Sequence, residues 1–183
     1  MAVYSDEKIE FFNRATRDSS FKMPEPHFHN KHEMYFVEKG KTQYFVGSEI
    51  FFLNAGELMF VPKGEFHKTD IGEKDITERL LLVFDDDFLG EEYINYLDEL
   101  RENKHIKIQP EKLYKIKRLI NIIENENKKN APDSELFQKI LLEEILVLIL
   151  RYKKSPSISL SESHKTIQDI AKYITENVGG DLS

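Results

Sequence analysis

The sequence contains no cysteine among its 183 residues. This absence excludes disulfide bonds, thiolate nucleophiles and thiolate metal sites. Long hydrophobic runs are absent as well, since the longest uninterrupted apolar stretch, Ile145 to Leu150, is far too short to span a bilayer. The first residues, Met1 to Glu7, have neither the basic start nor the apolar run of a signal peptide. We therefore expect a cytoplasmic protein with no membrane partner.

The sequence also has no excess of positively charged residues. The chain has 26 Lys and Arg residues against 33 Asp and Glu residues, for a net charge of -7. Domains that bind nucleic acid usually carry a basic surface, so this polypeptide is expected to be a poor DNA binder by itself. With 40% hydrophobic and 32% charged residues, the composition is that of a soluble protein with one domain and an additional segment.

Short apolar runs separated by turn signals occupy the region from Lys22 to Phe84. The runs cover residues 34–37, 44–46, 50–53, 58–61 and 79–84, and turns that contain glycine or proline recur every eight to ten residues. This spacing is typical of an antiparallel sandwich or barrel. The segment before Phe21 has a few apolar residues among charges, which indicates an arm laid over a neighbouring surface or a frayed terminus.

Four side chains in this region can ligate one divalent cation: His27, His29, Glu33 and His67. His27 and His29 share one face of an extended strand because alternate residues do so. Residues 30–32 can then turn the chain so that Glu33 opens the return strand. Imidazole combined with carboxylate suits zinc, nickel, iron, manganese or copper rather than calcium. The alternative is that these side chains line a pocket without any metal.

Three aromatic residues of the expected strands, Tyr35, Tyr44 and Phe60, are candidates for binding a small molecule. Aromatic residues in strands also commonly form the core, so this second interpretation stays open. The remaining histidines are expected at the surface because each lies in a polar stretch; they are His32, His105 and His164.

The hydrophobic period changes to that of helices after Phe84. The expected elements are a helix from Asp85 to about Leu100, a strand over 105–108, a helix opened by Pro110, and a helix from residues 132–134 to about Tyr152. The fold class is therefore α+β, with an antiparallel barrel followed by two long antiparallel helices.

The last of these helices is apolar on every side between Ile145 and Leu150. A helix that rests on one core needs an apolar stripe of only about 100°. The surplus surface is covered either inside the monomer or by the same helix of a second subunit. We favour the second interpretation, which predicts a homodimer through the two long helices.

A serine-rich linker, residues 155–163, follows the third helix. Beyond it, residues 164–183 contain one amphipathic stripe that ends at Gly179 and Gly180. A single helix cannot bury its own apolar face, so we expect this segment to begin a second domain. Residues 1–154 would then form the first domain.

Two motifs in the strand region resemble those of the cupin superfamily. The first, from His27 to Gly40, reads His-x-His, three residues, Glu, six residues, Gly; the second, from Gly56 to His67, reads Gly, five residues, Pro-x-Gly, two residues, His. The chain departs from the family pattern at Phe21 and Ile71, where glycine and asparagine are usual. The resemblance implies a double-stranded β-helix with a metal at the four candidate ligands.

The whole arrangement of barrel, two helices, linker and the segment 167–177 resembles the AraC/XylS family of bacterial transcription regulators. The resemblance implies that the barrel senses a small molecule, that the helices dimerise, and that a C-terminal pair of helix-turn-helix units binds DNA. Only the first helix of that DNA-binding region matches here. A metal-dependent cupin enzyme, an oxygenase or isomerase, is the alternative; we favour the regulator, because residues 155–183 have no role in an enzyme and no general acid or base stands out beyond the ligand set.

Overall fold

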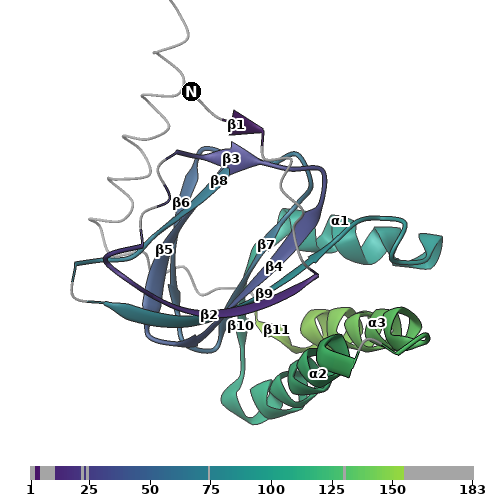
Figure 1. Ribbon diagram of the computed structural model, residues 1–183. Coiled ribbons are helices and arrows are strands. Elements are labelled where there is room, and N and C mark those ends of the chain that lie inside the picture. Colours follow the sequence, from purple (N-terminus) through teal and green to yellow (C-terminus); the bar gives the residue numbers. More distant parts are fainter. Residues whose placement is uncertain are drawn as a thin grey trace, which may run out of the picture.

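The computed structural model describes residues 3–4, 11–21, 23, 25–73, 75–129 and 131–154. It consists of a two-sheet β-barrel with helices packed against one of the sheets (Figure 1). The linker expected over residues 155–163 and the helix expected over 164–183 lie outside the described residues. The expected α+β architecture, with an antiparallel barrel and two long helices, is confirmed.

The barrel is built from two sheets. The smaller has the order β1-β3-β8-β5-β6 and the larger the order β11-β10-β7-β4-β9-β2. Their strands are β1 (Val3–Tyr4), β2 (Phe12–Asp18), β3 (His27–Phe28), β4 (His32–Lys39), β5 (Lys41–Val46), β6 (Glu49–Asn54), β7 (Glu57–Val61), β8 (His67–Asp70), β9 (Ile76–Phe84), β10 (His105–Ile108) and β11 (Lys153–Lys154).

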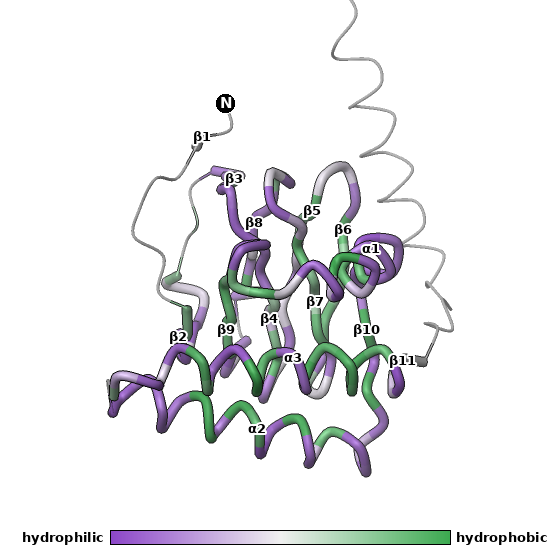
Figure 2. Tube along the Cα trace, turned by 90° about the vertical axis from the view of Figure 1, so that its right-hand side faces the viewer, coloured by the Kyte–Doolittle hydropathy of each residue, from purple (hydrophilic) through white to green (hydrophobic). Residues whose placement is uncertain are grey.

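Two long helices, α2 (Pro110–Lys129) and α3 (Ser134–Tyr152), form an antiparallel pair beneath the larger sheet. In Figure 2, α3 lies between this sheet and α2. A 3-10 turn, η1 (Glu91–Tyr93), leads into the shorter helix α1 (Ile94–Glu102). No helix among the described residues has both the length and the apolar character that crossing a bilayer requires.

The larger sheet is buried on both faces, which explains why β4 and β7 lack alternation between apolar and polar residues. One face packs on the helices through Met34, Phe60 and Leu82. The other face encloses the barrel interior and includes Tyr35 and Met59. Residues that are adjacent in the sequence therefore belong to two separate cores.

The region around Ile145 is covered within the chain. Ile145, Leu146 and Ile149 are each 0% exposed and belong to the core between the sheet and the helices. The expectation that a second subunit is needed to cover this surface is therefore wrong, because the sheet contacts one side of α3 and α2 contacts another. A dimer interface would have to use other residues of these helices.

Two boundaries differ from the sequence-based expectation. Residues 12–18 of the segment before Phe21 form β2, which pairs along its whole length with β9, so this part is a barrel strand rather than an arm or a frayed terminus. The helix expected from Asp85 begins nine residues later, at Ile94. The Asp85 carboxylate accepts a hydrogen bond from the Phe88 amide (3.0 Å) and so closes a separate turn before η1.

Glu57 joins β7 to β10 through a partly buried polar cluster. Its carboxylate accepts hydrogen bonds from His105 (2.7 Å) and the Asn54 amide (3.2 Å) and lies 2.8 Å from Lys107 Nζ. Burial alone would raise the pKa of Glu57, but these three partners outweigh it and lower the pKa to about 2. The charged carboxylate thus stabilises the strand that leads from the barrel to α2.

We expect Glu57→Gln to destabilise the protein at neutral pH by about 2 kcal/mol. Because the pKa is depressed in the folded state, from 4.5 to about 2, this contribution is present above pH 4.5 and is lost as the pH falls through this range. Urea unfolding between pH 7 and pH 3 measures it: the wild-type curve should fall more steeply than that of the variant. Glu49→Gln, at an exposed carboxylate, is the control, and parallel wild-type and Glu57→Gln curves would contradict the assignment.

Candidate functional site

Three histidine side chains meet at one end of the barrel. One ring nitrogen from each of His27, His29 and His67 lies within 4.8 Å of the others. The rings of His27 and His67 are 4.3 Å apart between centroids, and those of His29 and His67 are 5.0 Å apart. His29 and His67 are buried, with exposed fractions of 4% and 2%. The structure therefore brings together the three histidines that the sequence predicted as ligands.

Strand pairing and one turn place these rings. His27 on β3 stands opposite His67 on β8 in the register of the smaller sheet. The turn at residues 62–64 delivers His67, and its Gly64 amide donates a hydrogen bond to the His29 carbonyl (2.9 Å). Gly64 has a φ of 79°, a left-handed conformation that favours glycine. The Pro-x-Gly sequence thus ties the second motif to the first.

Backbone carbonyl groups determine which ring nitrogen carries the proton in His29 and in His67. His29 Nδ1 lies 3.0 Å from the Lys31 carbonyl, and His67 Nδ1 lies 2.9 Å from the Glu65 carbonyl. A carbonyl only accepts hydrogen bonds, so both Nδ1 atoms carry the proton, and in the neutral rings Nε2 keeps its lone pair. His67 Nε2 is buried and has no hydrogen-bond partner among the described residues. This is the arrangement of histidines that ligate a metal through Nε2.

Glu33 lies beside two of these nitrogens. Its Oε2 is 3.5 Å from both His29 Nε2 and His67 Nε2, and its Oε1 accepts a hydrogen bond from the Tyr44 hydroxyl. Burial alone would raise the pKa of Glu33, but His67, His29 and Tyr44 together hold it well below its ordinary value. The carboxylate is therefore ionised at neutral pH and available as an oxygen ligand.

The donor set fits a divalent transition metal. Ligand atoms about 2.0–2.1 Å from a tetrahedral ion lie roughly 3.4 Å from one another, close to the 3.5 Å between Glu33 Oε2 and each Nε2. Burial, followed by the charge of His67, lowers the pKa of His27 to about 4, so this ring is neutral near pH 7 and able to donate its lone pair. Three nitrogens and one oxygen suit zinc, nickel, iron or manganese.

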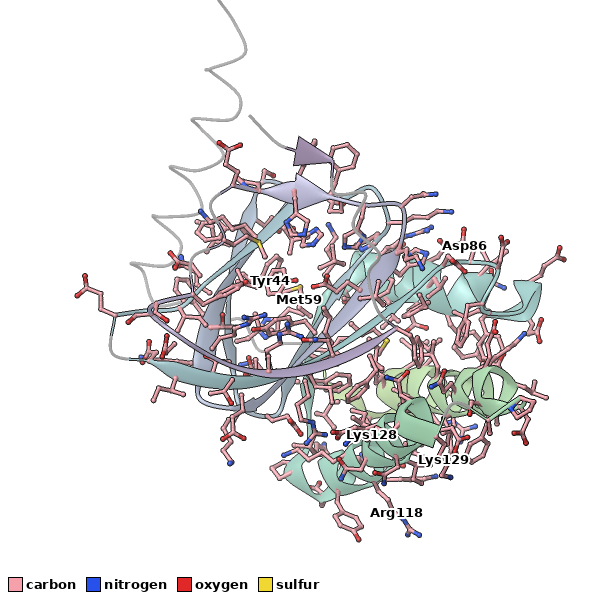
Figure 3. The ribbon with its side chains drawn as sticks, viewed as in Figure 1. Tyr44, Met59, Asp86, Arg118, Lys128 and Lys129 are labelled. Carbon is pink, nitrogen blue, oxygen red and sulfur yellow. The ribbon has the colours of Figure 1, made fainter. Side chains whose placement is uncertain are left out.

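A cavity of about 160 Å³ opens beside the cluster. Its lining residues are Arg17, Phe21, Met23, His27, His29, Glu33, Tyr35, Tyr44, His67, Thr69, Arg79 and Leu81. Figure 3 shows Tyr44 inside the barrel, near Met59. Tyr35 and Tyr44 thus lie where the sequence suggested. Phe60 does not, because its register opposite Met34 directs it to the helix-facing core, where it is 0% exposed.

Sequence reasoning missed the two arginines of this cavity, Arg17 and Arg79. Arg17 lies in the segment for which the sequence predicts an arm or a frayed terminus, and Arg79 is the first residue of an expected apolar run. The available signal was the alternation within β9, where Thr77, Arg79 and Leu81 share one face.

The two other histidines that the structure describes are not surface residues. His32 is 0% exposed; its Nε2 lies 2.7 Å from Asp86 Oδ1, and its Nδ1 accepts a hydrogen bond from the Lys63 amide (3.1 Å). His105 is half-buried against Glu57. These partners cannot be recognised from the sequence, because Asp86 is 54 residues from His32 and Glu57 is 48 residues from His105. His32 holds the turn that precedes His67, whereas His164 lies outside the described residues.

Residues 20–84 match the model of the Cupin domain family. The chain is 25% identical over 146 residues to the HTH-type transcriptional activator RhaR of Mannheimia succiniciproducens, an alignment that covers 80% of this chain and 50% of that protein. The chain thus spans about half the length of the curated relative it matches.

Similar solved structures include a cupin protein from Bacteroides fragilis, 16% identical with a TM-score of 0.40 over 43% of this chain and 68% of that one. Oxalate decarboxylase from Bacillus subtilis is 27% identical with a TM-score of 0.30 over 37% of this chain and 19% of that one. The match of residues 20–84 to the Cupin domain family shows that this chain contains a cupin domain, and the similarity to RhaR confirms the resemblance to AraC-type regulators that the sequence suggested.

Proposed function

We propose that the chain is the effector-sensing and dimerisation region of an AraC-type transcriptional regulator and is not an enzyme. The similarity to RhaR over 146 residues carries this proposal, and the cavity in the barrel supplies a binding site for the effector. Residues 1–154 form the sensor, residues 155–163 the linker, and residues 164–183 begin the helix-turn-helix domain that contacts operator DNA in the cytoplasm.

His27, His29, Glu33 and His67 hold a divalent metal in this proposal. The buried Nε2 atom of His67, which lies 3.5 Å from Oε2 of the ionised Glu33, supports the assignment. A metal bound there supplies a Lewis-acidic site that attracts oxygen donors of the effector. The chain's own residues orient that site: Tyr44 holds Glu33, and the Glu65 carbonyl holds the ring of His67.

The larger sheet provides the route from the cavity to the helices. Tyr35 lines the cavity, whereas its neighbours Met34 and Phe36 pack in the core that contains α2 and α3. A ligand shifts an equilibrium only when it binds one arrangement more tightly than another. In this proposal, an effector that moves Tyr35 biases how β4 packs on the helix pair and hence how two DNA-binding domains are spaced in a homodimer.

The test uses the full-length natural protein and the DNA upstream of its own gene. Compounds that raise the melting temperature are expected to change operator affinity by about 5- to 150-fold, measured by fluorescence anisotropy. Leu81→Phe narrows the cavity and should abolish this response. Ile76→Phe, on the same strand but at a position 62% exposed, should respond like the wild type.

The sensing role would be contradicted if none of the stabilising compounds changed the affinity of the protein for operator DNA. Conversion of such a compound by the metal-loaded protein would support the alternative, a metal-dependent cupin oxygenase or isomerase. The observation that favours this alternative is the cluster of three histidines beside Glu33, which could hold a metal.

A further inference from the structure

Two arginines face the cavity from neighbouring strands. In the pairing of β2 with β9, Arg17 stands opposite Thr77, and Arg79 is two residues further along β9. Side chains two residues apart point to the same face, and such diagonal neighbours lie about 7–8 Å apart at the backbone. Both arginines line the cavity that also contains the histidine cluster, so one small molecule can contact both guanidinium groups.

Neither Arg17 nor Arg79 forms an ion pair with a carboxylate of the described residues. Among the same residues the buried Arg17 Nε has no hydrogen-bond partner, and the Arg17 guanidinium lies 4.0 Å from the ring centre of Phe21. Arg79, only 7% exposed, donates one hydrogen bond to the Asn13 carbonyl (3.1 Å). An arginine has five N–H donors, so both groups retain donors for a ligand.

The charge of the cavity differs in sign from that of the protein. Among the lining residues, Arg17 and Arg79 contribute two positive charges and Glu33 one negative charge, which leaves one positive charge before the histidines are counted. The whole chain carries -7. Burial lowers the pKa of Arg79, and the nearby charge of Arg17 acts in the same direction. A bound anion would relieve this repulsion between two like charges in a low-dielectric site.

We propose that the cavity binds a small carboxylate, held by Arg17 and Arg79 at one end and by the histidine cluster at the other. This inference rests on the proposed function, in which the cavity is the effector site. A planar carboxylate matches the fork of a guanidinium group, and such charge-assisted pairs are among the strongest hydrogen bonds in proteins. The aromatic ring of Phe21 holds the Arg17 fork in place.

The size of the cavity limits the ligand. Its volume is about 160 Å³, and a cavity of about 150 Å³ accommodates benzene. The ligand therefore has roughly six to ten non-hydrogen atoms. Small hydroxy acids, dicarboxylic acids and aromatic acids have this size, and those with a second oxygen donor can also reach the histidine cluster.

The experiment measures binding of paired probes to the full chain by titration calorimetry. The acids are lactate, malate, benzoate and salicylate, each compared with its primary amide, which has the same shape without the charge. Inorganic phosphate, glucose and arabinose complete the set. We expect at least one acid to bind and its amide to bind at least about tenfold more weakly.

Variants assign the effect to the two arginines. Arg17→Gln and Arg79→Gln should each weaken binding of that acid by roughly ten- to a hundredfold. Arg79→Lys keeps the charge but not the forked guanidinium group, so its affinity for the acid should lie between those of the wild type and Arg79→Gln. Arg118→Gln is the matched control, because Arg118 projects outward from α2, away from the barrel (Figure 3). Circular dichroism identifies any variant that fails to fold, and Arg17, which is only half-buried, provides the test if Arg79 variants do not fold.

Several results would overturn the carboxylate proposal. The proposal fails if no acid binds to the protein, or if an acid and its amide bind equally well. It also fails if both Gln variants bind the acid as tightly as the wild type, or if phosphate binds more tightly than every acid. Binding of glucose or arabinose in place of the acids would also overturn it, yet it would leave the sensing function intact. The operator measurement tests that function separately.

Discussion

Replacing His67 with alanine is expected to abolish the binding of divalent metal by this protein. His67 is the histidine whose buried Nε2 has no hydrogen-bond partner within the described part of the chain, and it lies close to both Glu33 and His27. Loss of an outer hydrogen-bond partner of a metal ligand typically lowers affinity about 10- to 100-fold. Loss of the ligand itself should exceed this range, and His29→Ala should behave in the same way.

Elemental analysis and competition with a chelating indicator measure this effect on protein prepared without chelators and on protein reconstituted with zinc, nickel, iron or manganese. The wild type should hold about one ion per chain. His105→Ala is the control, since His105 contacts Glu57 rather than the cluster, and its metal content should match the wild type. Substoichiometric metal in both wild-type preparations, unchanged in His67→Ala, would refute the site.

The fold should survive removal of the metal. Two apolar cores, one inside the barrel and one between the larger sheet and the helices, consist of side chains other than the candidate ligands, such as Leu53 and Ile123. Strand register and backbone hydrogen bonds already place His27, His29 and His67. A chelator should therefore change ligand binding while the circular dichroism spectrum stays the same.

Introducing a glutamate at Leu146 is expected to prevent folding rather than to separate subunits. Leu146 is 0% exposed in the core shared by the larger sheet, α2 and α3. An unpaired carboxylate there, together with the lost apolar contacts, should cost more than about 5 kcal/mol, and most domains have only about 5–15 kcal/mol of stability. We expect an unfolded or aggregated product.

The exposed start of α3 provides the contrasting variant. Leu136 and Ile140 are 61% and 51% exposed and lie one turn apart on α3, so we propose that this surface contributes to the homodimer. Leu136→Glu combined with Ile140→Glu should leave the circular dichroism spectrum intact and halve the mass in light scattering. An unchanged dimer would exclude this surface, and a soluble, folded Leu146→Glu monomer would contradict the burial argument.

The histidine cluster could be predicted because its members follow local rules. The His-x-His spacing fixes a shared strand face, and the Pro-x-Gly turn precedes His67 by a fixed number of residues. The strands and two long helices also have strong periodic signals. The two arginines that line the cavity could not be predicted in the same way. Arg17 and Arg79 become neighbours only because β2 pairs with β9.

Phe60 shows the physical limit of the sequence pattern. In β7 all five residues are buried, so hydrophobicity does not distinguish the face toward the cavity from the face toward the helices. Only the register with β4, which places Phe60 opposite Met34 and Met59 opposite Tyr35, decides between them. The same ambiguity led to the wrong assignment of Ile145 to Leu150, whose all-round apolar character fits a covered helix as well as a subunit interface.

The double-sided burial of the larger sheet separates two kinds of evolutionary change. Residues 35, 59 and 81 face the barrel interior, whereas residues 34, 58 and 82 face the helices. In the proposed sensor, substitutions at the first set can alter ligand specificity without disturbing the packing that holds α2 and α3. A new effector specificity could then evolve through alternate positions of β4, β7 and β9 while the packing of the helix pair is inherited unchanged.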